Sequence, residues 1–455
     1  MRSVIYLAAP SAERDPEAAA ERERLEEPRH PRRAVRRLLR RHREDRGRLR
    51  EILLTDGVLF EDRPAVARAL VAELTLADLF GRPTIHRLRG GRVERLVRDG
   101  DDYVDANGVR AKLLLNDRVA FAAADLEPPV RVDLKALAAK TLARRLVPVA
   151  RDGDRLVLRL GYPDGLTARA LVRLEAGRPR VECIDVDARR LARARATAAA
   201  LRDWTADLTR AAERMVLERP GFDEPKDEPE GEQEDGELRL AWRKAYFRAQ
   251  RTFTFREESY PVYDYRGNPT PPQVCIDFIF DTIERASGTW YRRRGRAPKR
   301  IVGGLDFDAL EGLRRRQTPS VLEYAADPST PLERHDVPAA DRVPFRRRAA
   351  FAAAVARQAD AYREGDVLII HGLRDEDMEE HFHTVLVLDT DPLTGIPTVV
   401  ADNAGRPRIR SLASAMSSAP RRSVKHRIRV ALPWLIAKRT GGNEEDAVQP
   451  GKNSL

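Results

Sequence analysis

Residues 274–285 read V-C-I-D-F-I-F-D-T-I-E-R, and this stretch decides the fold of the C-terminal half. Its apolar side chains follow the i, i+3, i+4, i+7 spacing of a helix with one buried face: Ile276, Ile279, Phe280 and Ile283. Thr270 is predicted to cap the helix, with Pro271 and Pro272 in its first positions. Cys275 then lies in the first turns, where free N–H groups and the helix dipole lower the pKa of a thiol.

Three short apolar strands are expected downstream of this helix. They cover residues 365–370, 383–388 and 397–401. His383 opens the second strand, and Asp402 and Asn403 close the third. A histidine that acts as a base needs an acceptor that fixes its tautomer, and either of these two side chains can supply one. The order along the chain therefore predicts a thiol site with Cys275 as nucleophile, His383 as base and Asp402 or Asn403 as orienting residue.

Four short segments carry a resemblance to a known family. They are V-C-I-D-F at 274–278, G-D-V-L at 365–368, H-T-V-L-V-L at 383–388 and V-V-A-D-N-A-G at 399–405. Together they resemble the NlpC/P60 family of the papain-like clan, over about residues 260–412. The resemblance implies an α+β fold in which the helix bearing the cysteine packs on a small antiparallel sheet. It also implies the same roles for Cys275 and His383, with Asp402 as the preferred orienting residue.

The resemblance further implies a cysteine peptidase or amidase that needs no cofactor or metal. Its substrate would be the stem peptides of peptidoglycan in a bacterial cell wall, and it would work in the periplasm or outside the cell. A protein without this activity would be expected in the cytoplasm. Tyr263, Tyr265 and Gln273 are candidates for the oxyanion or substrate site. Val274 and Ile276 depart from the small polar neighbours that the family's cysteine commonly has.

Three other functions fit parts of the same pattern. A transglutaminase-like acyl transferase uses Cys, His and Asp in this order. A zinc hydrolase could use the His381–His383 pair on one strand face. Further zinc ligands would come from nearby residues: His371, Glu379 and Glu380. In a non-catalytic binding module, Cys275 would be a core residue and an arginine-rich surface would bind the partner.

Charge is unevenly distributed along the 455 residues, which carry a net charge of +11. Residues 29–50 hold eleven arginines, and residues 218–237 hold ten acids. Shorter arginine runs lie at 292–296, 314–316 and 346–348. These runs could contact an anionic polymer, and those after the cysteine helix could form a specificity insertion. No run of 18 apolar residues is present, so no transmembrane helix is expected, and the apolar part of residues 1–15 is short for a signal peptide.

The sequence divides into six predicted segments of an α+β protein. They are a basic helical or disordered arm (1–50), a β-rich or α+β domain (51–186), a long helix (187–217), an acidic linker (218–237), the cysteine hydrolase-like domain (238–435) and a disordered tail (436–455). In the β-rich domain, hairpin turns are expected at Gly90–Gly91, Asp99–Gly100, Asn107–Gly108 and Asp152–Gly153. Cys183 lies in a strand pattern there and is predicted to be a small core residue.

Overall fold

The fold is of the α+β class, with helices and strands in nearly equal measure, 34% and 33%. The computed structural model describes residues 58–59, 84–89, 92–99, 102–111, 119–120, 130–131, 134–152, 154–175, 178–223, 237–373, 380–390 and 395–440. The predicted arm, most of the predicted acidic linker and the last fifteen residues, 441–455, lie outside this part of the chain. Within it, no helix is both long and apolar enough to cross a membrane.

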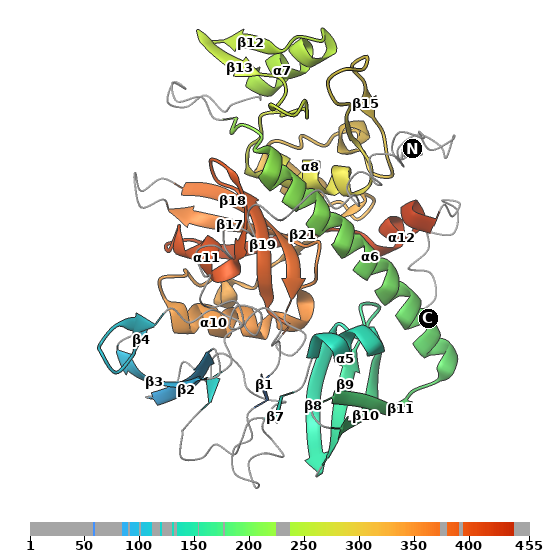
Figure 1. The fold of residues 1–455 in the computed structure, drawn as a ribbon, viewed down its shortest axis with the longest axis vertical. Helices are drawn as coiled ribbons and strands as arrows, with labels where there is room; N and C mark the ends of the chain where they lie inside the picture. The colour runs from blue at the N-terminus through green and yellow to red at the C-terminus, as the bar shows by residue number, and fades with distance from the viewer. Residues whose placement is uncertain are drawn as a thin grey trace.

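A six-stranded antiparallel sheet forms the centre of the C-terminal half (Figure 1). Its strand order is β16-β21-β17-β18-β19-β20. The strands are β16 (Leu332–Asp336), β17 (Val367–Leu373), β18 (Glu380–Thr390), β19 (Pro397–Asn403), β20 (Pro407–Ser411) and β21 (Ser423–Val430). The three predicted strands are β17, β18 and β19, which lie side by side. The sheet is therefore wider than the sequence predicts, because β16, β20 and β21 extend it on both sides.

Helices cover both faces of this sheet. On one face, Val367, Ile369 and Leu386 pack with helices α6 (Ala188–Glu218) and α8 (Cys275–Ala286). On the other face, Leu368 and Ile370 pack with α10 (Arg348–Arg357) and α11 (Leu412–Ser417). Alternate residues of each strand thus enter different cores, as the pleat of a strand requires. Because both faces are covered, these strands read as continuous apolar runs in the sequence.

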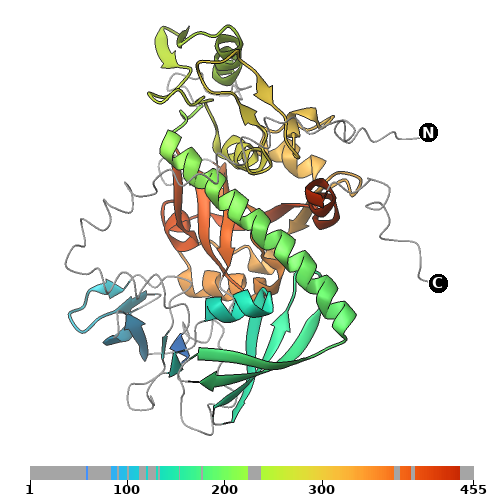
Figure 2. The same cartoon turned by 45° about the vertical axis from the view of Figure 1, so that its right-hand side comes forward.

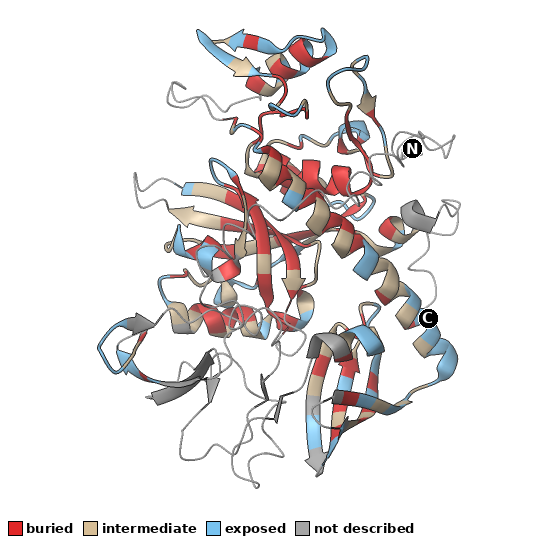
Figure 3. Ribbon diagram, viewed as in Figure 1, coloured by how far each residue is buried: buried red, intermediate tan, exposed pale blue. Residues whose placement is uncertain are grey.

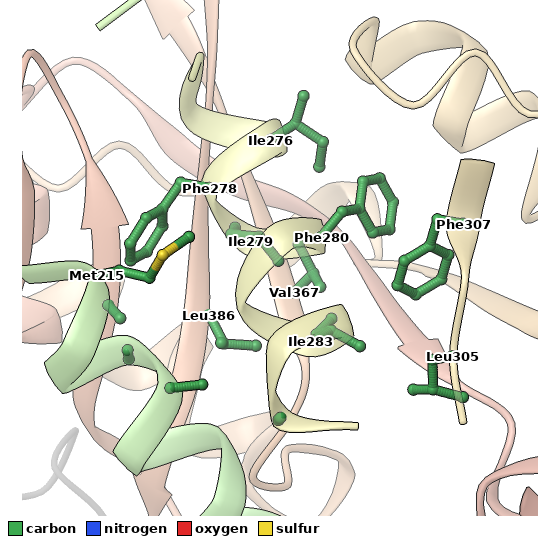
Figure 4. Close-up of a cluster of buried hydrophobic side chains, with 14 of the residues drawn as sticks. Met215, Ile276, Phe278, Ile279, Phe280, Ile283, Leu305, Phe307, Val367 and Leu386 are labelled. Atoms are coloured by element: carbon green, nitrogen blue, oxygen red, sulfur yellow. The ribbon is translucent and has the colours of Figure 1, made fainter. Parts of the chain in front are cut away.

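Helix α8 is buried along nearly its whole length (Figure 3). Figure 4 shows its predicted apolar face among Met215 of α6, Val367 of β17 and Leu386 of β18. The predicted start of the helix is wrong, since α8 begins at Cys275 and its N-cap is Val274. Thr270 to Gln273 stay extended, because the backbone of Gln273 pairs with Gly221 and Asp223 after α6. Prolines also disfavour helical geometry in the residue that precedes them.

The long helix predicted at 187–217 is α6, which runs diagonally across the molecule (Figure 2). The Asp187 side chain caps it by accepting a hydrogen bond from the Arg190 N–H. Its N-terminal half packs, through Ala194 and Ala198, on a second sheet. Its C-terminal half enters the core beside α8, where its buried residues include Trp204, Leu208 and Met215. The helix therefore belongs to the cores of both halves rather than only connecting them.

Two sheets make up most of the described N-terminal half. One has the order β11-β10-β9-β8 and packs on α5 (Leu134–Thr141) and α6. Its strands are β8 (Arg145–Asp152), β9 (Arg155–Gly161), β10 (Thr167–Glu175) and β11 (Arg178–Asp185). The other sheet has the order β5-β4-β3-β2-β6, with strands Arg110–Ala111, Asp102–Val104, Arg92–Asp99, Thr84–Arg89 and Val119–Ala120. Strands β1 (Val58–Leu59) and β7 (Val130–Arg131) form a separate pair. All four predicted hairpins join neighbouring antiparallel strands.

Cys183 is exposed, so its prediction as a core residue is wrong. The pairing of β10 with β11 shifts register where Leu171 faces Cys183 and Val172 faces Val181. This bulge at Glu182 breaks the alternation of faces along β11. Val181 and Ile184 therefore both pack on the core, and Cys183 lies on the outer face of the sheet.

The other elements of this half are short. They are α7 (Glu237–Phe247), β12 (Thr252–Phe255), β13 (Glu258–Pro261), β14 (Trp290–Tyr291), β15 (Arg300–Ile301), α9 (Thr318–Tyr324) and the 3-10 helices Phe307–Ala309, Ala339–Asp341 and Ala359–Ala361. A last helix, α12, runs from Leu432 to Thr440, and its Leu435 is buried in the core with α8. The described residues 436–440 of the predicted disordered tail are therefore helical.

Candidate active site

Cys275 is the first residue of α8 and is partly buried. The first N–H groups of a helix have no carbonyl partner within the helix, and they form its positive end. The apolar face that begins at Ile276 fixes the direction of this end by burying the helix against the sheet. The thiol is thereby held at a position where a negative charge is favoured.

His383 and Asp402 lie on neighbouring strands where the ladder between those strands stops. Strands β18 and β19 pair from Thr390 and Pro397 to Leu386 and Ala401. His383 and Asp402 lie just beyond this paired stretch, and His383 Nε2 is 2.9 Å from Asp402 Oδ2. Both side chains are buried, Asp402 completely. This contact leaves Nδ1 as the ring nitrogen available to the thiol.

The Cys275 thiol and the His383 ring interact, and their pKa values shift in opposite directions. Burial raises the pKa of Cys275, but the hydrogen bond and charge of His383, together with hydrogen bonds to Thr384, outweigh burial and lower that pKa below its usual value. Burial also disfavours protonated His383, but Asp402 and Cys275 together raise its pKa to about 9. These opposite shifts favour a thiolate–imidazolium pair, which is the reactive form of a cysteine nucleophile.

Asp402 is held by a second cation as well as by the imidazole. Arg410 Nε donates to Asp402 Oδ1 at 3.1 Å, and Arg410 Nη2 donates to Oδ2. Burial raises the pKa of Asp402, but His383 and Arg410 outweigh it and lower that pKa. The carboxylate therefore stays ionised and accepts from both partners at once.

Of the two predicted orienting residues, the structure places Asp402 beside His383. Asn403 is also completely buried, but neither atom of its amide has a hydrogen-bond partner among the described residues. It follows Asp402 along β19, so its side chain points to the opposite face of the sheet, where Ala401 packs with α8. The orienting contact in this structure is thus made by the carboxylate.

The three predicted oxyanion or substrate residues have other contacts. Tyr263 is buried against the ring of Tyr246, with ring centroids 5.9 Å apart. Tyr265 is 84% exposed, and the Arg266 guanidinium lies over its ring. Gln273 is completely buried, and its amide donates to Asp281 Oδ2 at 2.5 Å. None of these contacts involves Cys275 or His383.

An ion network surrounds α8 and accounts for part of the arginine-rich sequence after it. Asp277, Asp281 and Glu284 lie on one buried stripe of the helix. Their basic partners are Arg239, Arg300, Arg315 and Arg316. Of the predicted 314–316 run, Arg315 is 9% exposed in its side chain and Arg316 is 16% exposed, so these two arginines face the protein interior. They hold the cysteine helix in place and are not free to bind a polymer.

The predicted zinc pair has no third ligand in the described part of the chain. His383 contacts Asp402 and Cys275, while His371 stacks on Phe382 and lies 2.6 Å from Lys425 Nζ. No group of three His, Cys, Asp or Glu side chains that could hold a metal occurs among the described residues. Glu379, another predicted ligand near this pair, lies outside them.

Arg410 was missed in the sequence, although a signal for it exists. It lies on β20, which pairs with β19 through Val400 and Arg410 and through Asp402 and Arg408. The turn A-G-R-P after Asn403 predicts a hairpin that returns the chain along β19. A hairpin of that register places Arg408 and Arg410, but not Ile409, on the face of the sheet that carries Asp402.

No family model, curated protein or solved structure matches this chain in the comparisons with known proteins. The function is therefore argued from the geometry of the site.

Proposed function

We propose that the protein is a thiol-dependent amide hydrolase that uses Cys275, His383 and Asp402. The observation that carries the proposal is the position of His383, which contacts the thiol of a helix N-terminus and a buried carboxylate. Helix α8 supplies the thiol, and the consecutive strands β18 and β19, about a hundred residues further along the chain, supply the imidazole and the carboxylate. The papain-like arrangement of helix and sheet expected from the sequence is part of the same proposal.

In the first half of the proposed reaction, the Cys275 thiolate attacks the carbonyl carbon of the amide. A sulfur–carbon bond forms, and the developing oxyanion accepts a hydrogen bond from the free N–H of Cys275. The imidazolium of His383 then gives its proton to the leaving nitrogen as the carbon–nitrogen bond breaks. An amine leaves, and the acyl group remains on sulfur as a thioester.

In the second half, water attacks the thioester carbon and His383 takes a proton from it. The carbon–sulfur bond breaks, a carboxylic acid leaves and the thiolate–imidazolium pair is restored. Asp402 keeps Nε2 protonated throughout and stabilises the charged ring. A primary amine in place of water would give acyl transfer through the same thioester, which is the transglutaminase-like alternative.

Stem peptides of peptidoglycan are the first substrates to assay, because of the sequence resemblance and the charge beside the site. Arg406 is exposed in the turn between β19 and β20, three residues after Asn403. A cation at this position favours a substrate that carries carboxylates, as stem peptides do.

The test is mass spectrometry of purified muropeptides and of a peptide library after incubation with the protein. We expect cleavage products with the wild type and with Cys183→Ala, but none with Cys275→Ala. Cys183 is the matched control because it is the chain's other thiol and is exposed on a distant sheet. Identical products from the wild type and Cys275→Ala would reject the enzyme and favour the binding module. Products that incorporate an added primary amine would identify a transferase.

A further inference from the structure

The carboxylate of Asp402 accepts hydrogen bonds from two different side chains. Arg410 approaches with Nε on Oδ1 and Nη2 on Oδ2, while His383 Nε2 approaches Oδ2 at 2.9 Å. The Arg410 side chain is only 12% exposed, and its remaining nitrogen, Nη1, lies 3.4 Å from both the Ser414 carbonyl and the Ser418 hydroxyl. Arg410 is therefore tied to the strand, to the carboxylate and to the region of α11.

This bidentate contact, or fork, between a guanidinium and a carboxylate fixes the plane of the carboxylate, because two parallel N–H donors match its two oxygens. Without the fork, Asp402 could rotate about its side-chain bonds and turn Oδ2 away from the imidazole. The second effect of Arg410 is charge. A carboxylate that is shared between a guanidinium and an imidazole attracts the imidazole proton less strongly than one that serves the imidazole alone.

We propose that Arg410 is a positioning residue of the catalytic site, which aims Asp402 at His383 and limits how tightly His383 holds its proton. The inference rests on the proposed function, since it concerns the same three groups. It adds a fourth member, which acts through Asp402 and touches neither the thiol nor the substrate.

Few other charged groups face this part of the site in the described residues. Cys275 comes from α8, and Arg408 lies opposite Asp402 in the β19–β20 ladder. His381 shares the strand face of His383, and β17 places Ile370 opposite His383 and Gly372 opposite His381. The only cation that forks the Asp402 carboxylate among the described residues is Arg410, so a change there is expected to dominate the response.

Two substitutions separate geometry from charge. Arg410→Lys keeps the charge but loses the fork, whereas Arg410→Gln loses the charge and keeps a hydrogen-bond donor. The readout needs no substrate: the rate at which iodoacetamide alkylates Cys275, followed by peptide mass spectrometry across pH in a Cys183→Ser background. The rate for a thiolate–imidazolium pair rises in two steps, once when the pair forms and again when the imidazolium loses its proton.

We expect Arg410→Gln to move the upper step to higher pH by roughly one unit, because the carboxylate then serves the imidazole alone. We expect Arg410→Lys to leave that step in place and to slow alkylation of the pair several-fold. The matched control is Arg429→Gln. Arg429 forks the equally buried Asp366 in the same sheet, at 2.8 Å on both oxygens, and should leave both steps unchanged.

The outcomes distinguish the two proposals. If wild-type Cys275 is alkylated in one step like an ordinary thiol, the proposed triad is rejected and the role of Arg410 with it. If the wild type shows two steps but the upper step does not rise in Arg410→Gln, only the inference on Arg410 is rejected. Should Arg410→Gln fail to fold by circular dichroism, Arg410→Lys decides, and an unchanged alkylation rate in that variant rejects the inference.

Discussion

At the scale of single residues, the opposite pKa shifts of Cys275 and His383 set the range of pH in which the site can work. The pKa of Cys275 is lowered, and that of His383 is raised to about 9. The charged pair therefore forms at a pH below the ordinary thiol pKa and persists until the imidazolium loses its proton. The raised pKa of His383 also stabilises the folded protein. This contribution to the free energy of unfolding is complete below the unfolded pKa of 6.5 and is lost as pH rises through about 9.

We predict that the rate of hydrolysis falls as pH rises through about 9 in the wild type. We expect Asp402→Asn to move this falling limb of the pH–rate profile to lower pH. The amide removes the negative charge that keeps His383 protonated and can hold the ring in the wrong tautomer, so the rate should also fall ~100-fold or more. The measurement is kcat/KM against pH. Asn403→Ala is the control, because Asn403 does not contact the ring, and an equal displacement of the limb in both variants would contradict the role given to Asp402.

At the scale of elements, α8 is held by charge on one stripe and by apolar packing on another. Asp281 is the centre of the charged stripe, with Arg239 at 2.7 Å, Arg315 at 2.6 Å and the Gln273 amide at 2.5 Å. Burial raises the pKa of Asp281, but Arg239 and Arg315 outweigh it and lower that pKa. Removing one partner of such a buried network leaves the other charges without compensation.

We therefore predict that Asp281→Asn lowers the free energy of unfolding by about 3–5 kcal/mol, as measured by urea denaturation. Asp360→Asn is the control, since Asp360 pairs with Arg145 at 2.9 Å but is 86% exposed. Its loss should cost less than about 1 kcal/mol. Equal costs in the two variants would show that the buried network does not anchor the helix.

Helix α8 and strands β17 to β19 could be predicted from the sequence because their apolar patterns are local properties. The grouping of Cys275, His383 and Asp402 could also be predicted, because their order follows the order of those elements. Other features depend on partners far away in the chain. The start of α8 is set by the pairing of Gln273 with residues after α6, and the outward position of Cys183 by a bulge opposite β10. Strand β21 is not predicted because it contains several basic residues. Its Arg429 is accommodated in the sheet by an ion pair with Asp366, which is distant in the sequence.

At the scale of the whole molecule, α6 connects the two halves by packing in both. A buried ion pair fixes it to the cysteine helix: Arg285 donates to Glu218 at 2.6 and 2.9 Å. The Arg285 guanidinium also lies over the Trp290 ring, 4.6 Å from its centroid. The predicted boundary at 218–237 therefore separates two parts that share a core, although the division into domains stays a prediction.

A protease site inserted within residues 224–236 tests how far the halves depend on each other. After cleavage, we expect the fragment that ends with α6 to co-elute with residues 237–455 in size-exclusion chromatography, because α6 covers the core next to α8. Repeating the cut in Glu218→Gln, which leaves Arg285 buried without its ion pair, should weaken this association. Separation of the fragments without that substitution would mean that α6 only links two independent domains.

The ion network around α8 also has a consequence for heat and for salt. The cost of removing charges from water falls as temperature rises, whereas apolar burial gains little more. Dissolved salt screens buried charge pairs far less than exposed ones. The helix that carries the nucleophile should therefore be among the last parts to loosen in hot or saline surroundings, so that catalytic capacity ends together with the fold and not before it.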